Sequence, residues 1–167
     1  VIESDAGETQ LPPGELDVVI ETYYSVISPG TELAALLPPV RDDKSAKARF
    51  PYFPGYAAVG KVLEVGVGVS KLKPGDIIFA HTPHASHAKF DHTKTVWAQV
   101  PKSLTSEERL PLVPFARLAT VGLTALVLTK ARPGQLVAVV GLGLVGQLAA
   151  QCALVSGYQV IGLDPSE

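Results

Sequence analysis

The sequence predicts a mixed α/β fold in which a small, partly open β-barrel precedes a parallel β-α-β unit. Short apolar segments separated by proline and glycine turns fill the first part of the chain, which is typical of small barrels. An apolar strand pattern, a glycine-rich loop, a helix pattern and a second strand pattern follow, in the order of a β-α-β unit. We therefore expect a first domain over residues 1–115 and a second over residues 116–167.

The strands of the first domain are predicted from alternating apolar residues. In LDVVIET the residues Leu16, Val18 and Ile20 fall on one face, as in a half-buried strand. Further strand patterns cover residues 58–65, 77–80 and 96–100. Turn-forming residues such as Lys73 to Asp76 separate them. Several short strands with such turns favour a partly open barrel.

Helical spacing begins near the proposed domain boundary. Thr105 with Glu108 three residues later matches a capping box. Apolar residues at helical spacing then predict a helix over residues 117–130, with a buried face at Leu118, Val121, Ala125 and Leu128. The next apolar segment, residues 136–140, is expected to be a parallel strand buried on both faces.

A G-x-G-x-x-G motif follows that strand. Its members are Gly141, Leu142, Gly143, Leu144, Val145 and Gly146. In such a motif the first glycine permits a tight turn, the second lets the backbone approach a pyrophosphate, and the third lets the helix pack closely. The helix N-terminus adds free amides for the phosphates. With its flanking strands and helix, the motif predicts dinucleotide binding.

Asp164 favours NAD over NADP. It follows the second strand pattern, 18 positions after Gly146, near the spacing of about 20 residues for a carboxylate that accepts hydrogen bonds from the adenosine ribose. A carboxylate there repels a 2′-phosphate. We therefore expect NAD as the cofactor.

Composition excludes several other classes of protein. The chain has 167 residues, 47% hydrophobic and 18% charged, with a net charge of −2 and no basic stripe, which argues against nucleic-acid binding. Its apolar stretches are interrupted before the roughly 20 residues of a membrane span. The single cysteine, Cys152, is expected to be a small buried hydrophobe in a reducing compartment. We expect a cytoplasmic protein with no membrane partner.

Four segments carry a resemblance to a known family. They are YYSVISPGTEL, FPYFPGYAAVGKVLEVGVGVSKLKPGDIIFA, FARLATVGLTAL and RPGQLVAVVGLGLVGQLAAQ. With these segments in this order, the chain resembles the medium-chain dehydrogenase/reductase superfamily, the relatives of zinc alcohol dehydrogenase. The resemblance covers nearly the whole chain. It implies a GroES-like, partly open β-barrel followed by the first β-α-β unit of a Rossmann nucleotide-binding domain.

The resemblance also implies that the chain corresponds to only part of a superfamily member. Superfamily members are about twice as long, so we expect this chain to correspond to a first half that is inactive by itself. A parallel half-sheet leaves apolar faces uncovered, so we expect marginal stability. The whole enzyme is expected to take a small-molecule substrate and to form a homo-oligomer.

The zinc ligands of the family have no counterpart in this sequence. Zinc-dependent relatives carry a cysteine before the Gly-Thr-acid step, a His-Glu pair after the Pro-Gly turn, and a cysteine four residues before a threonine near the nicotinamide. The corresponding positions are Pro29, Tyr56 with Ala57, and Ala116. These are not zinc-binding side chains, so we expect no catalytic zinc.

Several polar residues of the family's site are retained. Thr31 matches the hydroxyl that hydrogen-bonds the reacting oxygen, Glu32 the carboxylate behind it, and Thr120 a residue beside the nicotinamide. Without zinc, Thr31 and Tyr56 are candidate donors to charge on the substrate oxygen, and Tyr56 is a candidate proton donor. The alternatives are a turn role for Thr31 and Glu32 and a packing role for Tyr56.

Three histidines spaced by three residues also raise the question of a metal site. His81, His84 and His87 could converge on a metal only in a helix, and Pro83 argues against one. A metal here is therefore disfavoured, and a cleft-lining role for His84 or His87 is the remaining hypothesis.

Together these features predict an NAD(H)-dependent, zinc-independent oxidoreductase that transfers hydride to or from a carbonyl/alcohol substrate. An NADPH-dependent quinone or enoyl reductase is one alternative, against which Asp164 argues. A non-catalytic nucleotide-binding protein is another, against which Thr31 and Glu32 argue. The resemblance does not choose the substrate.

Overall fold

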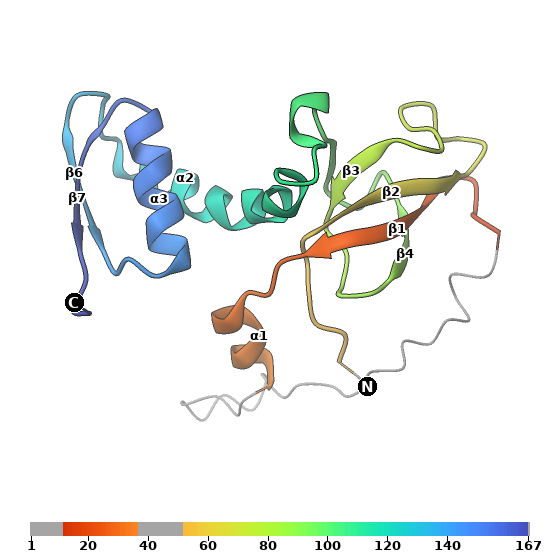
Figure 1. The fold of residues 1–167 in the computed structure, drawn as a ribbon, viewed down its shortest axis with the longest axis horizontal. Helices are drawn as coiled ribbons and strands as arrows, with labels where there is room; N and C mark the ends of the chain where they lie inside the picture. Colours follow the sequence, from red (N-terminus) through yellow and green to blue (C-terminus); the bar gives the residue numbers. More distant parts are fainter. Residues whose placement is uncertain (1–11, 37–51, 167) are drawn as a thin grey trace. The chain divides into compact units, whose positions relative to one another are not determined.

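The structure is a computed structural model that describes residues 12–36 and 52–166. The chain forms two compact units, Val1–Pro114 and Phe115–Glu167 (Figure 1). Each unit is described by itself below.

The first unit is built on an antiparallel five-stranded sheet in the order β4-β1-β2-β3-β5. Its strands are β1 (Asp17–Ser25), β2 (Ala58–Val65), β3 (Ile77–Ala80), β4 (His87–Asp91) and β5 (Trp97–Gln99). Within the described ranges no ladder joins β4 to β5, so the sheet is open at these two edges, as expected for a partly open barrel. β2 and β3 have the predicted bounds, and β5 is shorter than the predicted strand over 96–100.

The core of this unit lies mainly on one face of the sheet. Val18 and Ile20 of β1 pack there with Val62 of β2 and Ile78 of β3. The predicted alternation is only partly correct, because Leu16 precedes the strand and is exposed, whereas Val19 is buried. A smaller cluster of Val59, Val100 and Leu110 lies apart from this core.

A strand and an α-helix of the first unit were not predicted. β4 carries only Ala88 and Phe90 as apolar residues, and both point into the core. The helix α1 (Pro29–Leu36) replaces the turn expected at Pro29-Gly30. A proline is well suited to the first helical position, since its fixed φ fits the helix and its missing N–H has no intrahelical partner there.

The capping box expected at Thr105 is wrong. The Thr105 hydroxyl donates to the carbonyl oxygen of Lys102 instead of accepting from a helix N–H. Short 3₁₀ helices occupy this region, η1 (Lys102–Leu104) and η2 (Leu110–Phe115). The α-helix begins only after the second of these.

The second unit contains α2 (Ala116–Thr129), β6 (Leu136–Val140), α3 (Leu144–Val155) and β7 (Gln159–Leu163). β6 and β7 pair in parallel, as a β-α-β unit requires. The buried face of α2 contains Leu118, as predicted, but continues through Gly122 and Leu126 instead of Val121, Ala125 and Leu128. Gly122 explains the shift, because a Cβ there would lie 2.6 Å from Cα of Ala149 in α3. The missing side chain lets the two helices approach closely on that face.

Two burial predictions for this unit are wrong. β6 is not buried on both faces: its burial alternates along the strand, and Val140 on the more open face is 81% exposed. Cys152 is half-buried rather than buried.

One segment of the described residues is long and apolar enough to cross a membrane by length and composition alone, Leu110–Thr129. Helices in the cores of soluble proteins meet the same criteria of length and composition. Here Pro114 and Arg117 interrupt the segment, and Gly122 faces α3. We therefore interpret Leu110–Thr129 as a packing segment.

Candidate functional site

The glycine motif forms the turn between β6 and α3. Gly141 has φ +88°, a conformation that favours glycine, and its N–H donates to the carbonyl oxygen of Leu163 at 2.7 Å. Gly143 precedes the first residue of α3 with an extended backbone. A Cβ on Gly146 would overlap the carbonyl oxygen of Gly141, whereas a Cβ on Gly143 would meet nothing within 4 Å. Gly146 therefore closes the helix onto the turn, and Gly143 leaves open space above the helix N-terminus.

Leu144 and Val145 form the first turn of α3, and Leu142 covers β7. The side chain of Leu142 lies against Gly162, where a Cβ would be 2.9 Å from its Cδ1. The Leu142 carbonyl oxygen accepts from Nε2 of Gln147 at 2.9 Å. The loop is thus held at both ends by side chains of its own unit.

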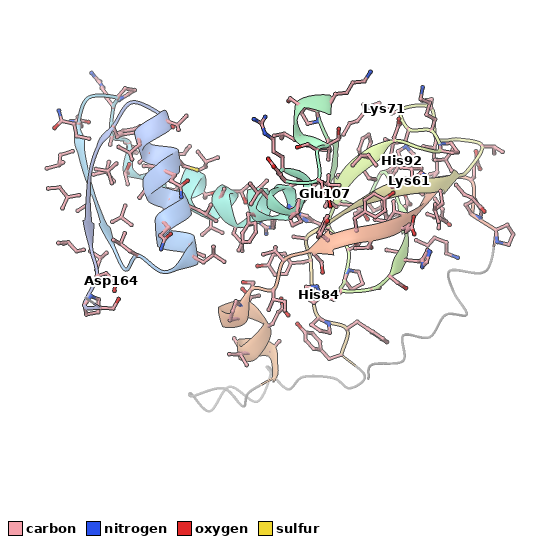
Figure 2. All side chains as sticks on the ribbon, in the orientation of Figure 1. Lys61, Lys71, His84, His92, Glu107 and Asp164 are labelled. Carbon is pink, nitrogen blue, oxygen red and sulfur yellow. The ribbon has the colours of Figure 1, made fainter. Side chains whose placement is uncertain are left out.

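Asp164 lies at the end of β7 beside this loop (Figure 2). Its Oδ2 accepts the Leu142 N–H at 2.6 Å, and its Oδ1 accepts from the N–H of Ser166 at 2.9 Å and from the Ser166 hydroxyl. The Ser166 hydroxyl, followed by these N–H groups, lowers the pKa of the Asp164 carboxyl below its ordinary value. The carboxylate is therefore ionised at neutral pH, and its remaining lone pairs can accept ribose hydroxyls.

Thr120 bonds within its own helix. Its hydroxyl donates to the Arg117 carbonyl oxygen at 2.7 Å and accepts from Nη1 of Arg117 at 2.9 Å. The side chain is exposed in the second unit. Its proposed place beside a nicotinamide stays a prediction.

Glu32 occupies the centre of a polar cluster in the first unit. It lies in α1, is 8% exposed, and its Oε1 accepts the N–H of Ser28 at 2.8 Å. Both carboxylate oxygens lie 3.2 Å from Nε2 of His84. On the other side of the ring, Nδ1 of His84 lies 2.9 Å from the hydroxyl of Ser25. The ring of His84 thus links Glu32 to Ser25, which lie 52 and 59 residues before it in the sequence.

Thr31 lies at the exposed edge of the same cluster. It precedes Glu32 in α1, and its hydroxyl accepts from the Ser28 hydroxyl at 3.2 Å. An accepting hydroxyl keeps its own proton to donate. Thr31 can therefore serve as a donor to another group.

The Pro-Gly turn before Tyr56 borders the cluster. The Pro54 carbonyl oxygen accepts the backbone N–H of His84 at 2.8 Å. Gly55 has φ +99°, and a Cβ there would lie 2.5 Å from the nitrogen of His84. Tyr56 is half-buried and Ala57 is buried. The turn's backbone, rather than a metal-binding pair, meets His84.

The three spaced histidines do not converge. The ring of His81 packs edge-on against Phe79, with centroids 5.5 Å apart, and His87 contacts its neighbour Ser86. Among residues 12–36 and 52–166, no group of three or more His, Cys, Asp and Glu side chains could hold a metal ion.

Sequence reasoning missed Ser25 and the pairing of His84 with Glu32. The histidine-rich segment HTPHASH led to the hypothesis that His84 lines a cleft. The two partners of His84 lie 52 and 59 residues away in the sequence, so the segment itself did not indicate them. The only local signal was the Ser28-Pro-Gly-Thr-Glu sequence, in which an acidic side chain can reach back to the N–H at a helix start.

The chain is similar to known dehydrogenases and reductases, although it matches no family model. It is 27% identical over 151 residues to an alcohol dehydrogenase of Geobacillus stearothermophilus, covering 73% of this chain and 44% of that protein. It spans about half the length of the relatives that it matches.

Solved structures of dehydrogenases and reductases share the fold of this chain. Galactitol-1-phosphate dehydrogenase from Escherichia coli matches with a TM-score of 0.76 at 20% identity, over 95% of this chain and 52% of that one. Escherichia coli quinone oxidoreductase in complex with NADPH matches with a TM-score of 0.63 at 23% identity, over 91% and 45%. The chain is thus similar in sequence to alcohol dehydrogenases, and it shares its fold with solved dehydrogenase and reductase structures.

Proposed function

We propose that the protein is an NAD(H)-dependent oxidoreductase that moves a hydride to or from a carbonyl/alcohol substrate without a catalytic zinc. The observation that carries this proposal is the loop Gly141 to Gly146 on β6 and α3, with the ionised Asp164 at its side. Among the relatives are alcohol dehydrogenases and a quinone oxidoreductase, which supports a redox reaction.

The second unit would hold the cofactor. The open space at Gly143 and the N-terminus of α3 suit a pyrophosphate, since free amides there attract anions. Asp164 would accept the hydroxyls of the adenosine ribose and repel a 2′-phosphate. When bound, the nicotinamide supplies or accepts the hydride.

The first unit would handle the charge on the substrate oxygen. The positions of the family's zinc ligands hold Pro29, Tyr56 and Ala116, which do not bind zinc. Hydrogen-bond donors must therefore stabilise a developing alkoxide. Thr31 retains a hydroxyl proton for this purpose, and Tyr56 offers a phenol.

The cofactor assignment predicts a strong preference for NADH over NADPH. Hydrogen bonds to a charged group contribute about 1.5–3 kcal/mol, so Asp164→Asn should weaken NADH binding roughly tenfold or more and leave NADPH binding unchanged or tighter. Calorimetric titration of the purified protein with both cofactors measures the two dissociation constants.

Asp91→Asn is the matched control. Asp91 is another carboxylate that accepts from the residue two positions later, Thr93, but it lies in the first unit. Its replacement should leave both affinities unchanged. Tighter binding of NADPH than of NADH by the unmodified protein would contradict NAD specificity and favour a quinone or enoyl reductase. Binding of NADH with no turnover of any aldehyde, ketone, quinone or enone would favour a non-catalytic binding protein.

A further inference from the structure

The first unit contains a hydrogen-bonded chain of three side chains that the proposed cofactor site does not use. The hydroxyl of Ser25, the ring of His84 and the carboxylate of Glu32 follow one another with separations of 2.9 and 3.2 Å. They come from the end of β1, the loop between β3 and β4, and α1. Three separate elements therefore bring this set together.

The donor and acceptor roles of the His84 ring depend on its tautomer, and a carboxylate partner favours one tautomer of the neutral ring. A carboxylate only accepts, so Nε2 of His84, which faces Glu32, carries the ring proton. Nδ1 of the neutral ring is then an acceptor, and the hydroxyl of Ser25 donates to it. A base held between a hydroxyl and an orienting carboxylate is the arrangement that activates a hydroxyl for proton transfer.

The set is held rigidly at its inner end. The N–H of Ser28 fixes Glu32, and the carbonyl oxygen of Pro54 accepts the backbone N–H of His84. The side chain of Glu32 is 10% exposed and that of His84 21% exposed, whereas Ser25 is exposed. The chain thus runs from a buried carboxylate to a hydroxyl that solvent or substrate can reach.

Proton transfer suits this set better than nucleophilic attack. A nucleophilic serine needs backbone N–H groups free to bind an oxyanion. The N–H of Val26 already donates to Ala57 and that of Ser28 to Glu32. The hydroxyl of Ser25 is therefore placed to move a proton rather than to form an acyl intermediate.

We propose that Ser25, His84 and Glu32 form the proton relay of the oxidoreductase reaction, an inference that rests on the proposed function. In alcohol oxidation the substrate O–H bond breaks and its proton passes to Oγ of Ser25, while the Ser25 proton passes to Nδ1 of His84. The electron pair of the carbinol C–H bond would leave as hydride, and an oxidised nicotinamide, when bound, would supply the acceptor for it. The carbonyl product remains, with an imidazolium stabilised by Glu32. Reduction runs the same steps backwards.

In this assignment Ser25 is the catalytic residue that touches the substrate oxygen, and His84 and Glu32 act through it. Thr31 and Tyr56 then serve as hydrogen-bond donors.

The test compares Ser25→Ala, His84→Ala and Glu32→Gln with the control His87→Ala in the full-length protein. His87 belongs to the same histidine-rich segment, is exposed, and contacts Ser86. General acid–base groups contribute about 10²–10⁴-fold. We expect Ser25→Ala and His84→Ala to lower kcat at least a hundredfold with an unchanged NADH dissociation constant, and His87→Ala to match the unmodified enzyme. The assay uses NAD with benzyl alcohol or cyclohexanol, and NADH with benzaldehyde or cyclohexanone.

Two readouts separate a relay from a structural role. Added imidazole should restore part of the activity of His84→Ala and none of that of Ser25→Ala. Long-range ¹H–¹⁵N spectra should find the ring proton of His84 on Nε2, with the Nδ1 resonance displaced in Ser25→Ala. Retention of kcat within about twofold in Ser25→Ala, or a ring proton on Nδ1, overturns the relay. Absence of turnover in the unmodified protein contradicts the proposed function instead, and the ring spectra still decide the relay.

Discussion

Replacing Gly146 by alanine is expected to remove measurable NADH binding and to lower the stability of the second unit. The new Cβ would overlap the carbonyl oxygen of Gly141, which is backbone and cannot turn away. Overpacking typically costs about 1–3 kcal/mol. Helix propensity alone would make the alanine variant more stable by about 0.5–1 kcal/mol. A loss of stability would therefore be caused by the clash. Thermal unfolding and NADH titration measure the two effects.

Gly143→Ala is the matched control for the fold. The backbone of Gly143 has φ −63°, which alanine adopts freely, and no atom lies within 4 Å of its added Cβ. This variant should unfold at nearly the same temperature but bind NADH more weakly, because the methyl group occupies the space left for a pyrophosphate. Full NADH affinity in both variants would contradict cofactor binding at this loop.

Ile78→Ala is expected to reduce the unfolding free energy of the first unit by about 2–5 kcal/mol, the usual cost of emptying a buried isoleucine site. Ile78 lies on the central part of the sheet, is 0% exposed, and packs in the core with Val18, Ile20 and Val62. The neighbouring strands fix these side chains, so the cavity cannot collapse fully. Denaturant unfolding followed by the fluorescence of Trp97 measures the change.

Val67→Ala provides the comparison for a surface position. Val67 is 96% exposed in the turn after β2, and its truncation should change the unfolding free energy by less than about 0.5 kcal/mol. An equally small effect of Ile78→Ala would mean that the residues around β3 do not form the core described here.

The parts of the fold with a local signal were predictable. β2, β3 and β6 have the predicted bounds, because alternation or an apolar run between turn residues marks them within a few positions. In β4 this signal is short, since HAKFD alternates but holds only two apolar residues. β4 becomes a strand by pairing with β1, as in Phe90 opposite Val18, and a pairing of residues so far apart leaves no trace in a short window.

The candidate site, like the fold, was predictable where its residues lie close together in the sequence and was missed where they lie far apart. The loop from Gly141 to Gly146 and Asp164 belong to one β-α-β unit, so their spacing was enough to propose them as one site, and the structure brings Asp164 to the loop. The partnership of Glu32 with His84 depends on α1 and on the loop before β4, two elements that the sequence did not reveal. Pro29-Gly30 indicated a turn, whereas tertiary structure made it the start of a helix.

Amide ¹H–¹⁵N spectra recorded during titration with NADH show whether NAD binds at the glycine loop beside Asp164. We expect saturable shifts that are largest for the amides of Gly141, Leu142, Gly143 and Asp164, and that are lost in Gly146→Ala. Shifts confined to residues outside the second unit, or no shifts at millimolar NADH, would contradict binding at this loop.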